Sequence, residues 1–168
     1  MNLRDILATS GIYSFVVIFV LGGFVYTQNR KKPINIYFGI FAITVGCWSV
    51  GSSLVNMIAD EQTALWALRG CYLFAVMLPP AFLRFSHLIA SVSRNSGRTW
   101  MIGSYSLSAV LLLFLFSDLF IERLRLIEPY HFRISDPGPV YYIFIVFFLL
   151  CVAEFYSCCM GHSRIRLE

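Results

Sequence analysis

The sequence predicts an all-α membrane protein, a bundle of five transmembrane helices with its N-terminus outside and its C-terminus in the cytoplasm. Apolar residues make up 58% of the chain and charged residues 13%, whereas a soluble domain has about 25% charged residues. Five apolar stretches each approach the roughly 20 residues that a bilayer-spanning helix requires. Most charges lie in short clusters between these stretches. Together these features exclude most classes of soluble enzyme.

The five spans are expected at residues 11–28, 34–57, 65–90, 100–118 and 139–160, within one transmembrane domain over 1–168. The first is interpreted as a retained helix, because no strongly basic start or small-residue cleavage site marks a signal peptide. The segments that follow the first, third and fifth spans contain seven Lys and Arg residues, and the segments on the other side contain four. Cytoplasmic loops carry the excess of Lys and Arg, which gives the orientation.

The second span carries a stripe of small and polar residues at alternating spacings of four and three, which places them on one face of a helix. Small residues let helices approach closely in lipid, and polar residues can hydrogen-bond across the contact. Two interpretations remain open: intramolecular packing of a central helix, and an interface that slides or dimerises. The stripe consists of Asn35, Gly39, Ala42, Gly46, Ser49, Ser53 and Asn56.

Ionisable side chains inside the third and fifth spans are the candidate functional residues. Arg69, Arg84 and His87 lie in the third span, and Glu154 lies in the fifth. Arg69 is near enough to the outer surface to extend its guanidinium outward. Because a lone charge in hydrocarbon is costly, we expect Glu154 to pair with Arg84 or His87, either as a static bridge or as a proton-linked switch. Pro79-Pro80 predicts a kink in the third span.

The segment 119–138 is expected to be the sizeable extracytoplasmic loop. Polar and apolar residues alternate over Arg123-Leu124-Arg125-Leu126 and His131-Phe132-Arg133-Ile134-Ser135, with a turn candidate at Glu128-Pro129-Tyr130. This pattern predicts a β-hairpin, which would pack on the helix ends because an isolated hairpin is marginal in water. Loops held by a rigid bundle often bind ligands. An unidentified ligand at the outer face and a plain connector therefore both remain open.

The sequence lacks the usual motifs of enzymes, so we expect no catalytic residue, no cofactor and no metal site in this chain. It contains no glycine-rich phosphate loop, no G-x-S-x-G and no H-E-x-x-H. The three histidines lack metal-ligand spacing. The basic clusters fit topology and anionic lipid headgroups rather than nucleic acid. The cysteines are interpreted as small apolar filler, because all lie within apolar stretches: Cys47, Cys71, Cys151, Cys158 and Cys159.

Short motifs follow one another in a characteristic order from about residue 10 to residue 164. The second span has Asn35, Phe38 and Trp48-Ser49-Val50-Gly51. The acidic turn Ala59-Asp60-Glu61 precedes Leu65-Trp66-Ala67-Leu68-Arg69, Tyr72, Pro79-Pro80, Phe82 and Phe85. The fifth span opens with Gly138-Pro139-Val140-Tyr141-Tyr142. In this order and spacing, the chain resembles the N-terminal seven-transmembrane sensor region of membrane histidine kinases.

The resemblance implies a sensor in the bacterial cytoplasmic (inner) membrane that passes a ligand or a membrane state to a cytoplasmic kinase. It also implies a homodimer whose last transmembrane helices shift against each other. The expected sixth and seventh spans, the phosphoacceptor helix and the ATP-binding domain are missing from the sequence. His162 stands in Gly161-His162-Ser163-Arg164, without the His-Glu context of the family. We therefore expect a sensor region without kinase activity of its own, truncated before its output domain.

Two other interpretations remain open for a chain that is embedded in a lipid bilayer. A small transporter or permease-like protein would use Arg84, His87 and Glu154 to line a polar path. A membrane scaffold subunit would have no chemistry of its own. A small transporter is expected to show interrupted helices in two repeats, and only the third span is obviously interrupted here. This pattern disfavours transport.

Overall fold

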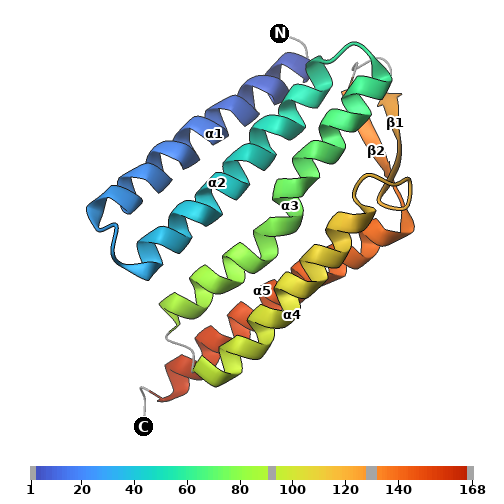
Figure 1. The fold of residues 1–168 in the computed structure, drawn as a ribbon. Helices are drawn as coiled ribbons and strands as arrows, with labels where there is room; N and C mark the ends of the chain where they lie inside the picture. Colours follow the sequence, from blue (N-terminus) through green and yellow to red (C-terminus); the bar gives the residue numbers. More distant parts are fainter. Residues whose placement is uncertain (1–2, 91–93, 128–131, 166–168) are drawn as a thin grey trace.

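The computed structural model describes residues 3–90, 94–127 and 132–165, which form a bundle of α-helices with one β-hairpin at one end (Figure 1). The N-terminus lies at the hairpin end of the bundle and the C-terminus at the opposite end (Figure 1). The elements in chain order are α1 (Leu3–Gln28), α2 (Pro33–Leu54), the 3-10 helix η1 (Val55–Met57), α3 (Glu61–Ile89), α4 (Arg94–Phe114), β1 (Ile121–Ile127), β2 (Phe132–Pro137) and α5 (Pro139–Ile165).

Four helical segments within the described residues are long and apolar enough to cross a membrane: Thr9–Gln28, Pro33–Met57, Glu61–Ile89 and Pro139–Cys158. The helix α4 is not among them, because its first turns contain Arg94 and Arg98 and its middle contains several serines. At 21 residues it would nevertheless be about 31 Å long. A membrane protein built of helices is therefore supported, and the crossing of α4 stays a prediction.

The fourth predicted span ends too late. Residues 100–118 were expected to be helical, but α4 ends at Phe114 and the chain then turns. The hydroxyl of Ser117 donates to the carbonyl of Phe114 at 2.6 Å, and serine and aspartate compete with helix hydrogen bonds in this way. Leu115 lies beyond the helix and is fully buried, whereas Phe116 is 47% exposed.

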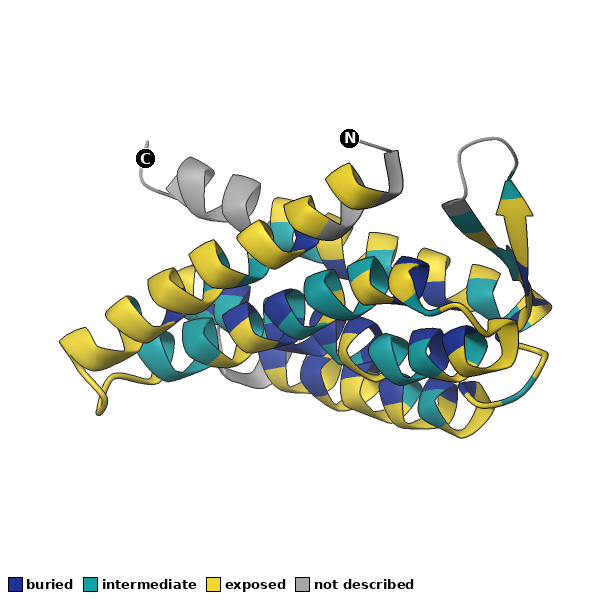
Figure 2. Cartoon of the chain, turned by 90° about the horizontal axis from the view of Figure 1, so that it is seen from above, coloured by how far each residue is buried: buried dark blue, intermediate teal, exposed yellow. Residues whose placement is uncertain are grey.

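The helix α3 is the centre of the bundle. It contacts α2 on one side and α4 and α5 on the other (Figure 1). The main hydrophobic core joins α3 to α4, β1 and α5. By contrast, α1 packs mainly on α2 and leaves most of its apolar residues exposed (Figure 2). Such an exposed apolar surface suits contact with lipid rather than water.

The helix α3 runs through Pro79-Pro80 as one helix, with both prolines buried. Proline has no N–H, so Pro80 leaves the carbonyl of Val76 without its usual partner within the helix. Ser108 of α4 supplies this partner: its Oγ donates to the Val76 carbonyl at 3.0 Å, and Ser108 is 1% exposed. In lipid, freed backbone groups need such partners from neighbouring helices. The predicted kink itself stays a prediction.

The predicted hairpin is confirmed. Strands β1 and β2 pair antiparallel, with Ile127 opposite Phe132 at one end, Ile121 opposite Pro137 at the other, and an irregularity between Ile121 and Arg123. The expected turn at Glu128-Pro129-Tyr130 falls outside the described residues. The hairpin contacts α3, η1 and α5, as expected for a strand pair that cannot bury enough surface alone.

Gly138 connects the hairpin to α5 at a point of close backbone approach. Its N–H donates to the carbonyl of Phe120 at 3.0 Å. A Cβ at this position would lie 2.2 Å from the carbonyl oxygen of Leu119, so a side chain would displace the backbone. Gly138 thus joins the start of α5 to the segment that follows α4.

Candidate functional site

A polar cavity of about 360 Å³ lies beneath the hairpin, between α1, α2 and α3. Its size is at the lower end of the range for small-molecule sites. The hydroxyls of Ser14, Ser52 and Ser53 donate to carbonyls of their own helices, which leaves their oxygen lone pairs able to accept. The lining residues are Ser10, Gly11, Ser14, Trp48, Ser49, Ser52, Ser53, Val55, Asn56, Leu68, Leu124, Arg133 and Ser135.

Arg133 ties the hairpin to the end of α2 and lines the cavity. Its Nη1 donates to the carbonyls of Val55, at 3.2 Å, and Ile58, and its Nη2 donates to Ala59 at 2.7 Å. Its backbone N–H donates to Oδ1 of Asn56 at 2.9 Å. Val55 is the C-cap of α2, and a cation near this helix end complements the helix dipole; Ile58 and Ala59 belong to the connection to α3. Arg133 forms none of the ion pairs found among the described residues; its charge acts on the nearby carboxylate of Asp60, and Arg133 is the charged residue that lines the cavity.

The stripe on α2 lies against α1. A Cβ added to Gly22 would lie 2.6 Å from the Cβ of Ala42, and one added to Gly11 would lie 1.6 Å from Oγ of Ser53. A Cβ on Gly46 would lie 3.1 Å from the ring of Phe15. This close approach corresponds to the interpretation as intramolecular packing. The role of the stripe as a sliding or dimer interface stays a prediction.

Both ends of the stripe are asparagines that bind backbone groups. Nδ2 of Asn35 donates to the carbonyl of Asn29 at 3.2 Å, within the α1–α2 connection. Asn56 accepts from the hairpin. Between them, Ser49 accepts at its carbonyl from the hydroxyl of Ser53 at 2.9 Å. The stripe therefore links α1, the basic connection and the hairpin within one chain.

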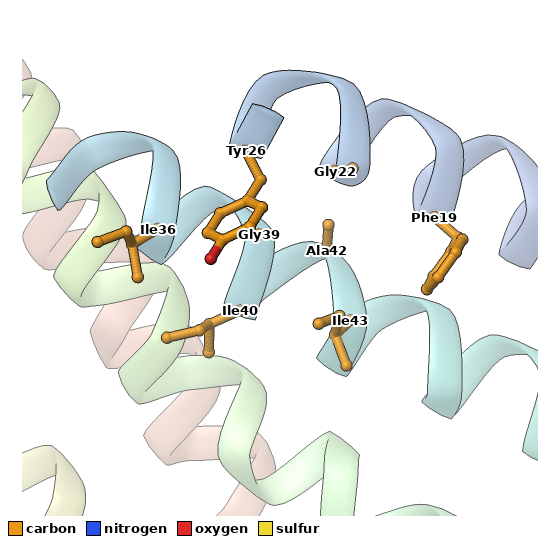
Figure 3. A pocket seen from close by; sticks show the side chains of 9 residues that line it. Phe19, Gly22, Tyr26, Ile36, Gly39, Ile40, Ala42 and Ile43 are labelled. Carbon is orange, nitrogen blue, oxygen red and sulfur yellow. The ribbon is translucent and has the colours of Figure 1, made fainter. Parts of the chain in front are cut away.

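An apolar cavity of about 410 Å³ lies between α1 and α2 (Figure 3). Gly22, Gly39 and Ala42 line it, and their small side chains leave space beside the close contact between the two helices. Phe19, Ile40 and other apolar side chains form its walls (Figure 3). Apart from the hydroxyl of Tyr26, the lining is apolar, which suits a lipid acyl chain rather than a ligand oriented by several polar groups.

Arg69 is buried and holds the segment between α4 and β1. It is 4% exposed, and its Nη1 donates to the carbonyl of Phe116 at 3.1 Å. Its Nη2 donates to Oδ1 of Asp118 and to the carbonyl of Ile121, both at 2.7 Å. The guanidinium thus extends toward the hairpin end and binds two backbone carbonyls and the exposed carboxylate of Asp118; its extension to the outer membrane surface stays a prediction. Its partners lie about 50 residues away and have no signature in the sequence.

The structure brings His87 and Glu154 together and leaves Arg84 apart. Nε2 of His87 lies 3.8 Å from Oε1 of Glu154, and the two side chains are 5% and 14% exposed. The guanidinium carbon of Arg84 lies 5.1 Å from the ring centre of Tyr37, over its face. Arg84 forms none of the ion pairs found among the described residues.

Cys158 joins the His87 and Glu154 pair, which sequence reasoning missed. Its Sγ donates to Oε1 of Glu154 at 3.3 Å. The two residues are four apart on α5 and therefore share one face of the helix. The spacing of four residues between Glu154 and Cys158 was visible in the sequence. It indicates a shared site only once the structure shows that His87 of α3 lies next to Glu154.

The aromatic residues that carry the family resemblance contact one another. The ring of Tyr72 lies 5.4 Å from Phe120 and 5.9 Å from Tyr141, at the hairpin end of α3 and α5. In the other half of the bundle, Phe38 of α2 lies 5.2 Å from Phe85 of α3. The motifs therefore mark the contacts that hold α3 to its neighbours.

Comparison with known proteins identifies one family, whose model covers most of the chain. The family model described as the N-terminal 7TM region of histidine kinase matches residues 11–164. The match extends from the first half of α1 almost to the end of α5. No curated protein and no solved structure matches the chain.

Proposed function

This chain belongs to the family of N-terminal 7TM regions of histidine kinases, and on that premise we propose that it is the membrane-embedded input region of a signal-transduction protein. The family match over residues 11–164 is the observation that carries the proposal. A region of this family is not itself catalytic, so phosphoryl transfer would belong to a cytoplasmic output domain that follows it in the parent protein.

The proposed stimulus site is the polar cavity beneath the hairpin. A ligand there would contact α1, α2 and the hairpin at once, so its binding energy could favour one arrangement of these elements over another. Serine hydroxyls and the positive charge of Arg133 line the space. We expect a small polar ligand that carries a negative charge, because only such a ligand uses both features of the wall.

The proposed route from this cavity to the output runs through the hairpin and α5. Arg133 binds the end of α2, and Gly138 joins β2 to α5 against the carbonyls of Leu119 and Phe120. A shift of the hairpin would therefore displace the first turn of α5. Since a helix is a stiff element, the displacement would reach the far end of the bundle, as in known hinge and helix-shift mechanisms.

The proposal includes a membrane arrangement. All five helices would cross a bacterial inner membrane, with the N-terminus and the hairpin outside and the C-terminal end of α5 inside. The N-terminus and the hairpin lie at the same end of the bundle, which supports this arrangement (Figure 1), as does the bias of Lys and Arg between the two sets of loops. In the parent protein, two copies would pair through their transmembrane helices.

The coding frame and one pair of variants test the function. A frame that continues past residue 168 into a helix with a His-Glu phosphoacceptor site and an ATP-binding domain would support the input role. A stop codon directly after residue 168 would instead favour a scaffold or a small transporter. Autophosphorylation of the parent protein in membrane vesicles then gives the activity to be measured.

In that assay, Ser52→Phe should fill the polar cavity and hold the output at one level, whatever stimulus is added. Val20→Phe is the matched control, because Val20 is 64% exposed on α1 and lies outside the cavity. It should leave the response unchanged. An unaltered response in Ser52→Phe would contradict the assignment of the cavity as the stimulus site.

A further inference from the structure

We propose that His87, Glu154 and Cys158 bind a single transition-metal ion of the zinc class between α3 and α5. One ligand atom from each residue can be chosen so that all three lie within 4.8 Å of one another. Oε1 of Glu154 lies 3.8 Å from Nε2 of His87 and 3.3 Å from Sγ of Cys158. The inference does not rest on the signalling role proposed above.

These separations fit the coordination shell of zinc. With bonds of about 2.1 Å to nitrogen and oxygen and about 2.3 Å to sulfur, ligand atoms of a tetrahedral site lie roughly 3.4–3.6 Å apart. The two distances from Glu154 bracket this range, and side-chain rotations that bring the ligand atoms of His87 and Cys158, which lie within 4.8 Å, closer together would close the site. Glu154 and Cys158 share one face of α5, and α3 packs against that helix.

The chemistry of the three donors selects the kind of ion. Imidazole nitrogen, carboxylate oxygen and thiolate sulfur together suit zinc and its neighbours among the divalent transition metals. Magnesium and calcium prefer shells made of oxygen atoms alone. The set therefore predicts zinc, with cobalt as its spectroscopic substitute.

Burial of these groups gives the physical reason for an ion. The His87 side chain is 5% exposed, and neither of its ring nitrogens has a hydrogen-bond partner among the described residues. A buried polar group without a partner costs free energy. A metal ion would take the lone pair of Nε2 and, at the same time, one oxygen of Glu154.

Charge balance favours the site in a membrane. Binding would form a sulfur–metal bond and release the thiol proton of Cys158 to solvent. The carboxylate and the thiolate would then neutralise a divalent cation, while His87 stays uncharged. A neutral cluster avoids the cost of placing net charge in hydrocarbon. Arg84, one turn before His87, is directed toward Tyr37.

The surroundings of Nδ1, the second ring nitrogen of His87, indicate how tightly the metal ion would bind. Metal-bound histidines usually donate their other N–H to a carboxylate, a carbonyl or water, and loss of such a partner costs about 10–100-fold in affinity. Nδ1 of His87 has no partner among the described residues. We therefore expect binding that is reversible by mild chelation, weaker than in structural zinc sites.

Cobalt titration of the full chain in detergent tests the site. The reduced, chelator-treated protein should bind one Co²⁺ per chain, with the visible bands of a tetrahedral ion and a thiolate charge-transfer band in the near ultraviolet. Added Zn²⁺ should remove both. Cys158→Ser should abolish the charge-transfer band, and His87→Gln and Glu154→Gln should each weaken binding by at least about tenfold. The matched control Cys47→Ser, on α2, should behave as wild type.

Thiol alkylation of the wild-type chain gives a second measurement that needs no variant. Bound Zn²⁺ should slow alkylation of Cys158 and leave the rate at Cys47 unchanged, as measured by peptide mass spectrometry. A wild-type protein without the thiolate band at saturating Co²⁺ would overturn the proposal. So would equal alkylation of Cys158 with and without Zn²⁺, or a band that survives in Cys158→Ser.

Discussion

At the scale of single residues, three arginines of one chemical type have three different environments. Arg69 and Arg133 bind backbone carbonyls at chain segments that change direction. Arg84 lies over an aromatic ring. The planar guanidinium can satisfy several carbonyls at once, which a lysine ammonium cannot do with the same geometry. Arg69 and Arg133 therefore serve as fixed points for the loops at the hairpin end.

Arg69→Gln should destabilise the protein by about 2–4 kcal/mol, because it leaves the buried carbonyls of Phe116 and Ile121 without a partner. Asp118→Asn should cost less than about 1 kcal/mol, since the Asp118 side chain is 81% exposed and an exposed ion pair contributes little. Unfolding in detergent, followed by circular dichroism, measures both. Similar losses in the two variants would show that the ion pair, and not the carbonyl contacts, stabilises this segment.

At the scale of elements, α3 depends on its neighbour α4 for a backbone hydrogen bond. Pro80 removes the donor that Val76 would use within α3, and Ser108 of α4 replaces it. The contact explains why a serine is buried in an apolar helix interface. It also gives α4 a specific register against α3 that apolar packing alone would leave less defined.

Ser108→Ala should cost about 1–3 kcal/mol, because the carbonyl of Val76 becomes buried without a partner. In a Pro80→Ala background, the new N–H at position 80 can donate to Val76, and the same serine substitution should then cost much less. A double-mutant cycle by chemical unfolding measures this coupling. Equal costs in the two backgrounds would count against the assigned role of Ser108.

The two strands of the hairpin are joined by an exposed ion-pair cluster of Arg123, Arg125 and Asp136, here called the clasp. Nε of Arg123 lies 2.8 Å and Nη2 of Arg125 lies 3.0 Å from Oδ2 of Asp136. The hydrogen bond from Arg123 lowers the pKa of the Asp136 carboxyl below its ordinary value, and Arg125 lowers this pKa further. Because the pKa is lower in the folded state, the carboxylate stabilises the hairpin at neutral pH and this contribution disappears on acidification.

We expect amide hydrogen exchange in β1 and β2 to rise below about pH 4, as pH falls through the lowered pKa of Asp136. The rates are to be corrected for intrinsic exchange at each pH. Asp136→Asn should raise exchange at neutral pH and remove the acid dependence. Glu122→Gln, on the neighbouring strand β1, is the control and should keep the wild-type profile. An unchanged profile in Asp136→Asn would contradict the clasp.

At the scale of the whole molecule, the bundle places the hairpin and the polar cavity at one end and the His87, Glu154 and Cys158 cluster toward the other. The hairpin, the polar cavity and Arg133 lie at the end that holds the N-terminus (Figure 1). The His87, Glu154 and Cys158 cluster lies further along α3 and α5, toward the C-terminal end of α5. The central helix α3 extends past both regions, so the bundle is suited to link events at its two ends.

A pair of single-cysteine probes tests the orientation and the crossing of α4 together. Glu122→Cys should react with a membrane-impermeant maleimide in intact cells, because β1 is expected outside. Arg98→Cys should react only after permeabilisation, because the start of α4 is expected inside. Labelling of both sites from the same side would show that α4 does not cross the bilayer.

Local sequence patterns predicted most elements but not the contacts between them. Apolar length predicted α1, α2, α3 and α5, and alternation predicted the hairpin, because each signal lies within one segment. The end of α4 was misplaced, since Leu115 and Phe120 are buried in the core beyond the helix rather than within a longer helix. The partners of Arg69 and Ser108, and the approach of Cys158 to His87, depend on the rotation and depth of separate helices, which no local pattern records.

The sequence by itself determined that the chain is a helical membrane protein of this family, because the length, polarity and order of its segments are set by the bilayer and carried in the residues themselves. The tertiary structure alone decided where each buried charge and hydroxyl finds its partner. The partners of Arg69 and Ser108 lie on other segments of the chain, and an unpaired polar group is costly in hydrocarbon. The packing that satisfies these groups therefore also builds the cavity and the three-residue cluster.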